Sequence, residues 1–312
     1  MEKLAAVSID LDEVHHYRAI HGLPFPEQGG RAARAVFEWA VPRALAFAKR
    51  RDLVLTFFVV GDDLRIDANA DVLKGAISEG HVVESHSMSH PYDLVRLGRD
   101  AIRREIEGSF ETIERRLGKR PQGFRAPGYT LSDDVLDVLE EAGALFDASL
   151  LPSPAYYVAK LAALGAIFTT GRRSSSIVGP ARAQLGPTEP YRPGRPHWIR
   201  GTRRLIEIPM RVTPGARLPV IGTSLGAVGP RVARALVRGC RAESTFSLEL
   251  HGMDFLDRTD GLDDLVGHVT ELARPFEARR EALDAALEEI GAAGFELTTL
   301  REIAIATARR EH

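Results

Sequence analysis

The chain has 312 residues, of which 44% are hydrophobic and 27% are charged, and these values are typical of a soluble globular protein. Its formal net charge of −2 provides no global electrostatic field that would favour nucleic acid or a membrane. Cys240 is the only cysteine, which excludes an intramolecular disulfide, and no apolar run reaches the roughly 20 residues that a membrane span needs.

The first residues contain no apolar core of signal-peptide length before the charged motif that begins at Asp10. We therefore expect a cytoplasmic protein, with peripheral contact at the inner face of the membrane as the alternative. Nucleic acid is not expected as a partner, and no sequence feature specifies an oligomeric state.

Short apolar runs alternate with amphipathic segments along the chain. The apolar runs predict strands at 5–9, 53–60, 81–85, 123–125, 145–147, 205–210, 245–250 and 295–298. The amphipathic segments predict helices at 31–50, 67–79, 93–117, 132–142, 230–241, 263–292 and 300–309. Alternation at this spacing predicts parallel strands joined by right-handed crossovers, and therefore an α/β fold with a closed or nearly closed barrel.

The alternation breaks over residues 151–204, which carry many prolines and the run Ser174-Ser175-Ser176. This composition predicts a long irregular insertion, and long loops in compact domains are usually lids or binding loops. We expect residues 1–312 to form a single barrel domain that carries this insertion.

Polar motifs follow the predicted strands, at the point where each strand ends. In a parallel α/β barrel the active site forms at the carboxyl ends of the strands, so these side chains are expected to share one rim. They are Asp10 and Asp12, His86 and His90, Arg125, Asp147, and His251.

His86 and His90 lie four residues apart, which predicts that both imidazoles share one face of a helical turn and can reach one ion. Asp12, arriving from a separate strand, would supply a third ligand and leave the fourth position open, as in catalytic metal sites. Carboxylate and imidazole ligands suit Zn²⁺, with Co²⁺ or Ni²⁺ as alternatives. The competing interpretation is a helix-capping turn built from the histidines and Ser87 and Ser89.

Proton transfer is assigned to two further residues. Asp10 stands two residues before Asp12 and is the expected general base for the attacking water; a second metal ligand or a strand-end cap is the alternative. His251 is the expected general acid for the leaving amine, because an amide anion is a very poor leaving group. Its alternative is a histidine that only satisfies local hydrogen bonds.

Arg125 is expected to pair with Asp10 and to set the orientation of that carboxylate. Pro127 and Gly128 predict a tight turn, after which the backbone N–H of Tyr129 is the expected oxyanion donor. Asp147 is expected to support His251 or Arg125, with a structural salt bridge as the alternative.

Five motifs in this order resemble the polysaccharide deacetylase family, carbohydrate esterase family four. They are Ser-Ile-Asp-Leu-Asp at 8–12, His-Ser-Met-Ser-His at 86–90, Arg-Ala-Pro at 125–127, Asp-Ala-Ser-Leu at 147–150 and Leu-His at 250–251. The resemblance implies a distorted (β/α)7-type barrel and metal-dependent removal of an acetyl or formyl group from an amino sugar, often with Zn²⁺.

Leu11 separates two aspartates that are usually adjacent in this family, and Gly128 separates Pro127 from the aromatic Tyr129. The spaced aspartates resemble cytoplasmic peptidoglycan-deacetylase-like proteins and aminoarabinose-lipid deformylases, which implies a lipid- or nucleotide-linked sugar as an alternative to a soluble one. An arginine-rich run could contact phosphate or anionic lipid, or could be a solvated loop. It comprises Arg192, Arg195, Arg200, Arg203, Arg204, Arg211 and Arg217.

Two other functions remain open at this point. One is hydrolysis of a non-sugar cyclic amide or imide, as in allantoinase-like relatives of the same fold, with the 151–204 insertion shaping the pocket. The other is a non-catalytic binding protein that retains the barrel. The metal content of the purified protein distinguishes the non-catalytic barrel from the two hydrolases, because an intact open site should retain or rebind metal.

Overall fold

The computed structural model describes residues 2–24 and 32–310. All strands in this part of the chain belong to one sheet, and each pairs with its neighbours in parallel. The strands are β1 (Leu4–Asp10), β2 (Leu55–Val59), β3 (Val82–Ser85), β4 (Gly123–Phe124), β5 (Phe146–Asp147), β6 (Ile206–Glu207), β7 (Thr245–His251) and β8 (Glu296–Thr298). Every predicted strand is therefore present, and most of the strands are shorter than the apolar run from which they were predicted.

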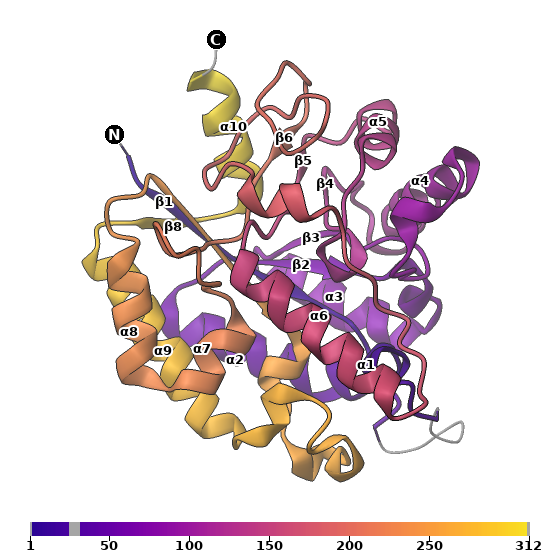
Figure 1. Ribbon diagram of the computed structural model, residues 1–312, viewed down its shortest axis with the longest axis vertical. Coiled ribbons are helices and arrows are strands. Elements are labelled where there is room, and N and C mark those ends of the chain that lie inside the picture. Colours follow the sequence, from indigo (N-terminus) through magenta and orange to yellow (C-terminus); the bar gives the residue numbers. More distant parts are fainter. Residues whose placement is uncertain (1, 25–31, 311–312) are drawn as a thin grey trace.

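The order across the sheet is β6-β5-β4-β3-β2-β1-β7, and β8 pairs with the first half of β1. The two ends of this path approach each other, because the backbone N–H of Arg211, just after β6, donates to the carbonyl of Ser247 in β7 at 2.9 Å. The sheet thus curls into an incompletely closed barrel, which confirms the predicted fold class (Figure 1).

Helices surround the curled sheet (Figure 1). They are α1 (Val14–His21), α2 (Val41–Arg51), α3 (Asp67–Ser78), α4 (Arg99–Leu117), α5 (Asp133–Glu141), α6 (Pro154–Thr169), α7 (Gly222–Val228), α8 (Pro230–Gly239), α9 (Phe276–Ala292) and α10 (Leu300–Arg310). A π-helical turn, Val36–Ala40, leads into α2; Arg31, the first residue of the helix predicted there, lies outside the described residues.

Alternation along the strands separates the core from the barrel interior. In β1, Val7 and Ile9 belong to the main hydrophobic cluster with the covering helices, whereas Ser8 and Asp10 bind Arg125 from the other face. Helix α10 closes the opposite end of the barrel, where Leu300 packs with Leu4 and residues of β2, β5 and β6. The polar interior therefore opens toward the carboxyl ends of the strands.

Several expectations of secondary structure were wrong: α1 and α7 were not predicted, and α4 begins at Arg99 rather than at residue 93. The insertion at 151–204 is not irregular throughout, because α6 occupies sixteen of its residues. The helix predicted over 263–292 begins only at Phe276; two short 3₁₀ turns, Asp263–Leu265 and Thr270–Ala273, precede it. Pro275 stands at the point where α9 starts, as expected for a residue that favours helix beginnings over helix interiors.

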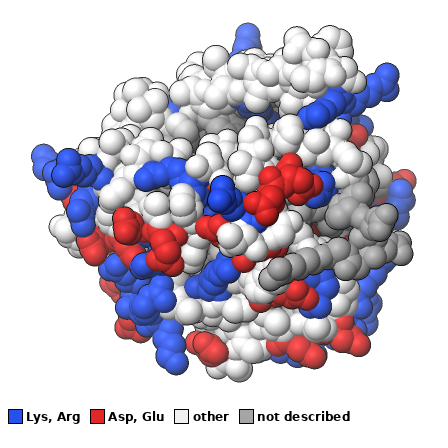
Figure 2. All heavy atoms as spheres, turned by 90° about the horizontal axis from the view of Figure 1, so that it is seen from below, with Lys and Arg blue, Asp and Glu red and all other residues white. Residues whose placement is uncertain are grey.

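On the face seen from below, acidic and basic side chains are intermixed, so no single sign of charge dominates it (Figure 2). Among residues 2–24 and 32–310, no helix has both the length and the apolar composition to cross a membrane.

Candidate active site

Several of the polar side chains that follow the strands meet around one cavity of about 390 Å³ at the carboxyl rim of the barrel. Asp10 is the last residue of β1 and His251 the last residue of β7, and the two are paired across these neighbouring strands. Asp12 and His86 enter from the loops that follow β1 and β3. Asp10, Asp12, His86 and His251 therefore share one rim, whereas His90, Arg125 and Asp147 do not line the cavity.

Asp12, His86 and His90 converge on one point. Asp12 Oδ1 lies 3.1 Å from Nε2 of His86 and 3.1 Å from Nε2 of His90, and the two ring nitrogens are 3.2 Å apart. All three side chains are buried, and they form one of the groups among the described residues that could hold a metal ion.

The convergence does not come from a helical turn, so that part of the prediction was wrong. Residues 86–90 form a loop in which Ser87 and His90 have φ values of 67° and 60°. The Ser87 hydroxyl accepts from the backbone N–H of His90 at 3.0 Å. Glu105 of α4 accepts from the backbone N–H groups of Met88 and Ser89, which holds the loop in this coiled form.

The donor set fits a divalent cation. His86 Nδ1 lies 2.8 Å from the carbonyl of Arg125, so this nitrogen carries the proton and the Nε2 lone pair faces Asp12. Asp12 Oδ1 is buried with no hydrogen-bond donor among the described residues. A buried carboxylate that meets two imidazole nitrogens is the chemistry of a mixed N/O metal site.

Asp10 stands beside this group without joining it as closely. Its Oδ2 lies 3.9 Å from His86 Nε2 and has no hydrogen-bond donor, while Oδ1 accepts from Arg125 Nη1 at 2.6 Å. Arg125 is fully buried; it also donates to the Ser8 hydroxyl and the Ala148 carbonyl, and it lies over the Phe58 ring. These contacts fix one oxygen of Asp10 and leave the other facing the cavity.

His251 lies beside a carboxylate that the sequence reasoning missed. Glu249 Oε1 lies 3.0 Å from His251 Nδ1, and Glu249 is fully buried. Burial alone would lower the pKa of His251, but the Glu249 carboxylate raises it well above its usual value. Residues 247, 249 and 251 alternate along β7, so the strand period was the signal that could have found Glu249.

Asp147 does not have the role expected beside His251, because Glu249 occupies that place. It accepts instead from the Ser149 hydroxyl at 2.7 Å and from the Ser149 backbone N–H at 3.2 Å. The Ser149 hydroxyl in turn accepts from the backbone N–H of Ala126, next to Arg125. Asp147 therefore helps to position the chain at Arg125 from beneath the cavity.

The backbone N–H of Tyr129 is engaged in a turn, where it donates to the Ala126 carbonyl at 3.2 Å. The expectation that this N–H faces a reacting group was therefore wrong. The Tyr129 hydroxyl lies 3.2 Å from His251 Nε2 and lines the cavity. Burial raises the pKa of this phenol well above its usual value, so it remains a neutral hydrogen-bond donor.

Comparison with known proteins agrees with this geometry. A family model described as polysaccharide deacetylase matches residues 37–146. The peptidoglycan deacetylase of Helicobacter pylori is 27% identical over 161 residues, 50% of this chain and 53% of that protein. A peptidoglycan-N-acetylglucosamine deacetylase of Bacillus cereus is 31% identical over 86 residues, 28% of this chain and 30% of that protein. The matched part of the chain, residues 37–146, is thus similar to the polysaccharide deacetylase family.

A solved structure assigned to the polysaccharide deacetylases of Mycobacterium smegmatis superimposes with a TM-score of 0.62 and 19% identity, covering 100% of this chain and 92% of that one. This likeness concerns the fold. The chain spans only 53% and 30% of the lengths of the two curated relatives described above.

Three more tyrosines line the cavity and were missed by the sequence reasoning; they are Tyr17, Tyr92 and Tyr156. Tyr17 of α1 and Tyr92 are both 7% exposed, and their hydroxyls have no hydrogen-bond partner among the described residues. A buried hydroxyl without a partner is costly, so these groups are available to bind a polar ligand. No sequence motif marks them, because each belongs to a loop or helix with no diagnostic spacing.

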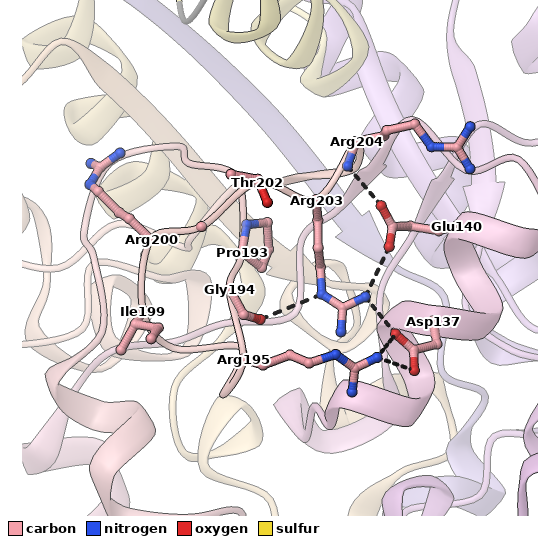
Figure 3. Close-up of a pocket in the computed structure, with 11 residues that line it drawn as sticks. Asp137, Glu140, Pro193, Gly194, Arg195, Ile199, Arg200, Thr202, Arg203 and Arg204 are labelled. Carbon is pink, nitrogen blue, oxygen red and sulfur yellow. Dashed lines mark hydrogen bonds and ion pairs between the residues drawn. The ribbon is translucent and has the colours of Figure 1, made fainter.

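Four arginines of the arginine-rich run, Arg195, Arg200, Arg203 and Arg204, line a second cavity of about 620 Å³ beside α5 (Figure 3). Arg203 Nη1 donates to Asp137 at 2.6 Å and to Glu140 at 2.9 Å, and Arg195 also pairs with Asp137. Arg211 is buried against Glu189, and Arg217 donates to the carbonyls of Gln184 and Gly186. Several of these guanidinium groups thus anchor loops of the insertion.

Proposed function

We propose that this protein is a member of the polysaccharide deacetylase family and a metal-dependent hydrolase that removes an acetyl or formyl group from an amino sugar. The observation that carries the proposal is the meeting of three groups in one cavity. These are the Asp12–His86–His90 cluster, the Asp10–Arg125 ion pair and the His251–Glu249 pair.

Asp12, His86 and His90 would hold the divalent ion, and their carboxylate and imidazole donors favour Zn²⁺, with Co²⁺ or Ni²⁺ as alternatives. Such an ion polarises an amide carbonyl and lowers the pKa of water. Three protein ligands leave room for substrate, which is the arrangement of catalytic sites rather than structural ones.

Asp10 takes the proton of the attacking water through Oδ2, the oxygen that Arg125 does not bind. His251 donates a proton to the nitrogen that leaves as the amine, and Glu249 keeps this imidazole protonated. The neutral Tyr129 hydroxyl, within reach of His251, orients the imidazole or donates to the substrate. Arg125, Asp147 and Ser149 act as positioning residues.

The test is a side-by-side assay of the purified chain, after metal removal by a chelator and after reconstitution with Zn²⁺ or Co²⁺. N-acetylated sugars, lipid-linked amino sugars and cyclic amides are supplied in parallel, and the released acid is measured. We expect metal-dependent release from an amino sugar and none from cyclic amides. Less than about 0.2 metal per chain, with no stimulation by added metal, would favour a non-catalytic barrel instead.

Replacement of Glu249 should change the pH dependence of the reaction. Because Glu249 raises the pKa of His251, Glu249→Gln should lower that pKa. The protonated acid is lost as pH rises through its pKa, so the alkaline limb of the kcat/KM profile should move to lower pH. Profiles of wild type, Glu249→Gln and Ser247→Ala, a buried neighbour on the same strand face, check this. An unmoved alkaline limb in Glu249→Gln would remove His251 from the acid role.

A further inference from the structure

One segment of the chain departs sharply from its overall composition. Residues 148–188 contain no Asp or Glu, although the whole chain has 43 of them. The same segment carries Lys160, Arg172, Arg173 and Arg182, so it is positively charged while the complete chain has a net charge of −2. Helix α6 forms the first half of this segment.

Helix α6 is apolar around its whole circumference, and Lys160 is its only charged residue. A helix of this composition is normally buried on all sides. In this structure, however, none of its sixteen residues is buried. It lies on the near side of the molecule in Figure 1, over the carboxyl rim of the barrel.

The two halves of α6 face different surroundings. At 3.6 residues per turn, Val158, Leu161 and Phe168 fall within an arc of about 80°. They are 63%, 44% and 79% exposed. The opposite half lines the active-site cavity with Ala163 and Ile167, among others. The apolar surface therefore runs from the cavity wall around to the outside of the protein.

We propose that the outer face of α6 docks on an anionic lipid bilayer, with Arg172, Arg173 and Arg182 beside it at the level of the lipid head groups. Apolar side chains flanked by basic residues are the composition of a helix that lies in the membrane interface. Sixteen helical residues extend roughly 24 Å, which is too short to cross a bilayer.

A second copy of the chain is the competing occupant, and charge disfavours it. A two-fold dimer through this face would bury the basic flank of both copies, with no acidic residue of the segment to pair with it. An anionic bilayer supplies the opposite charge. The surface predicted from sequence, the 192–217 run, is less suited, because Arg195, Arg203 and Arg211 are already paired with carboxylates.

Docking through α6 places the active-site cavity at the membrane surface, with an apolar wall leading into it. The substrate that suits this arrangement is an amphiphile, an N-acylated amino sugar joined to a lipid. This statement about the substrate rests on the proposed hydrolase function, whereas the docking itself does not.

The experiment is co-sedimentation of the full chain with vesicles of phosphatidylcholine alone and of phosphatidylcholine with phosphatidylglycerol. Wild type should bind the anionic vesicles, and the double variant Val158→Ser/Phe168→Ser should bind them about tenfold more weakly. Val232→Ser, an exposed valine on α8 with 46% of its surface accessible, is the matched control and should bind as wild type. Circular dichroism and thermal melting verify that each variant folds.

Wild type that stays in the supernatant, or a double variant that binds like wild type, would overturn the docking proposal. So would self-association of the wild type, measured by sedimentation velocity, that the double variant abolishes. Hydrolysis by wild type of a soluble N-acetylated oligosaccharide and of a vesicle-borne N-acylated glycolipid separates the two proposals. Vesicle binding with neither substrate cleaved refutes the proposed function alone; cleavage of the soluble substrate without vesicle binding refutes the docking alone.

Discussion

Asp10→Asn should lower kcat about 10²–10⁴-fold, the usual contribution of a positioned general base, while leaving metal stoichiometry unchanged. The amide of asparagine keeps the size of the carboxylate and can still accept from Arg125, but it cannot take a proton from water. Asp10 Oδ2 lies 3.9 Å from His86 Nε2, farther than the 3.1 Å that separates Asp12 from the same atom. In Asp10→Asn the metal content per chain should therefore equal that of wild type, while kcat falls.

Ser8→Ala is the matched control for Asp10→Asn. Ser8 lies on the same face of β1 and also accepts from Arg125, at 2.9 Å, but it has no basic group to offer. A loss of kcat far smaller than that of Asp10→Asn is expected. Full activity in Asp10→Asn would end the general-base assignment, and loss of bound metal would identify Asp10 as a ligand.

Arg125→Met should destabilise the protein by about 3–5 kcal/mol, because it leaves the buried Asp10 carboxylate without its cation. Both members of this pair are buried, at 0% and 1% side-chain exposure, and solvent cannot replace the lost partner. The free energy of unfolding in urea measures the effect. Activity should fall as well, since the orientation of Asp10 depends on this contact.

The double variant Asp10→Asn/Arg125→Met distinguishes an unpaired charge from a simple loss of packing. Removing both charges should recover part of the stability lost in Arg125→Met, because no isolated carboxylate remains. A double variant no more stable than Arg125→Met would show that packing of the guanidinium against Phe58 and its bonds to Ser8 and Ala148 dominate instead.

The strands and the rim that carries the chemistry were predictable because they depend on short-range patterns. Apolar runs of the right length between amphipathic segments located every strand, and parallel crossovers then placed Asp10, Arg125 and His251 at one end of the sheet. The strand period of two also places Glu249 on the same face of β7 as His251.

Other elements depended on contacts that local patterns do not encode. Helix α6 has no polar face, so its residues lack the periodic signal that predicts a helix, and the short helices α1 and α7 were not predicted either. The loop at 86–90 was taken for a helical turn because spacing alone cannot show that Ser87 and His90 adopt positive φ. That Tyr17 and Tyr92 line the cavity follows only from the tertiary arrangement of α1 and the loops around it.

The sequence by itself determined the α/β barrel, the rim on which the site forms and the residue types that gather there, because hydrophobic period and strand order follow from neighbours along the chain. Only the tertiary structure decided which groups meet. Asp10 pairs with Arg125 across 115 positions, and the loop fold brings His86 and His90 to Asp12. Such pairings arise from packing in three dimensions, because the residues involved are far apart along the chain and no local pattern specifies their contact.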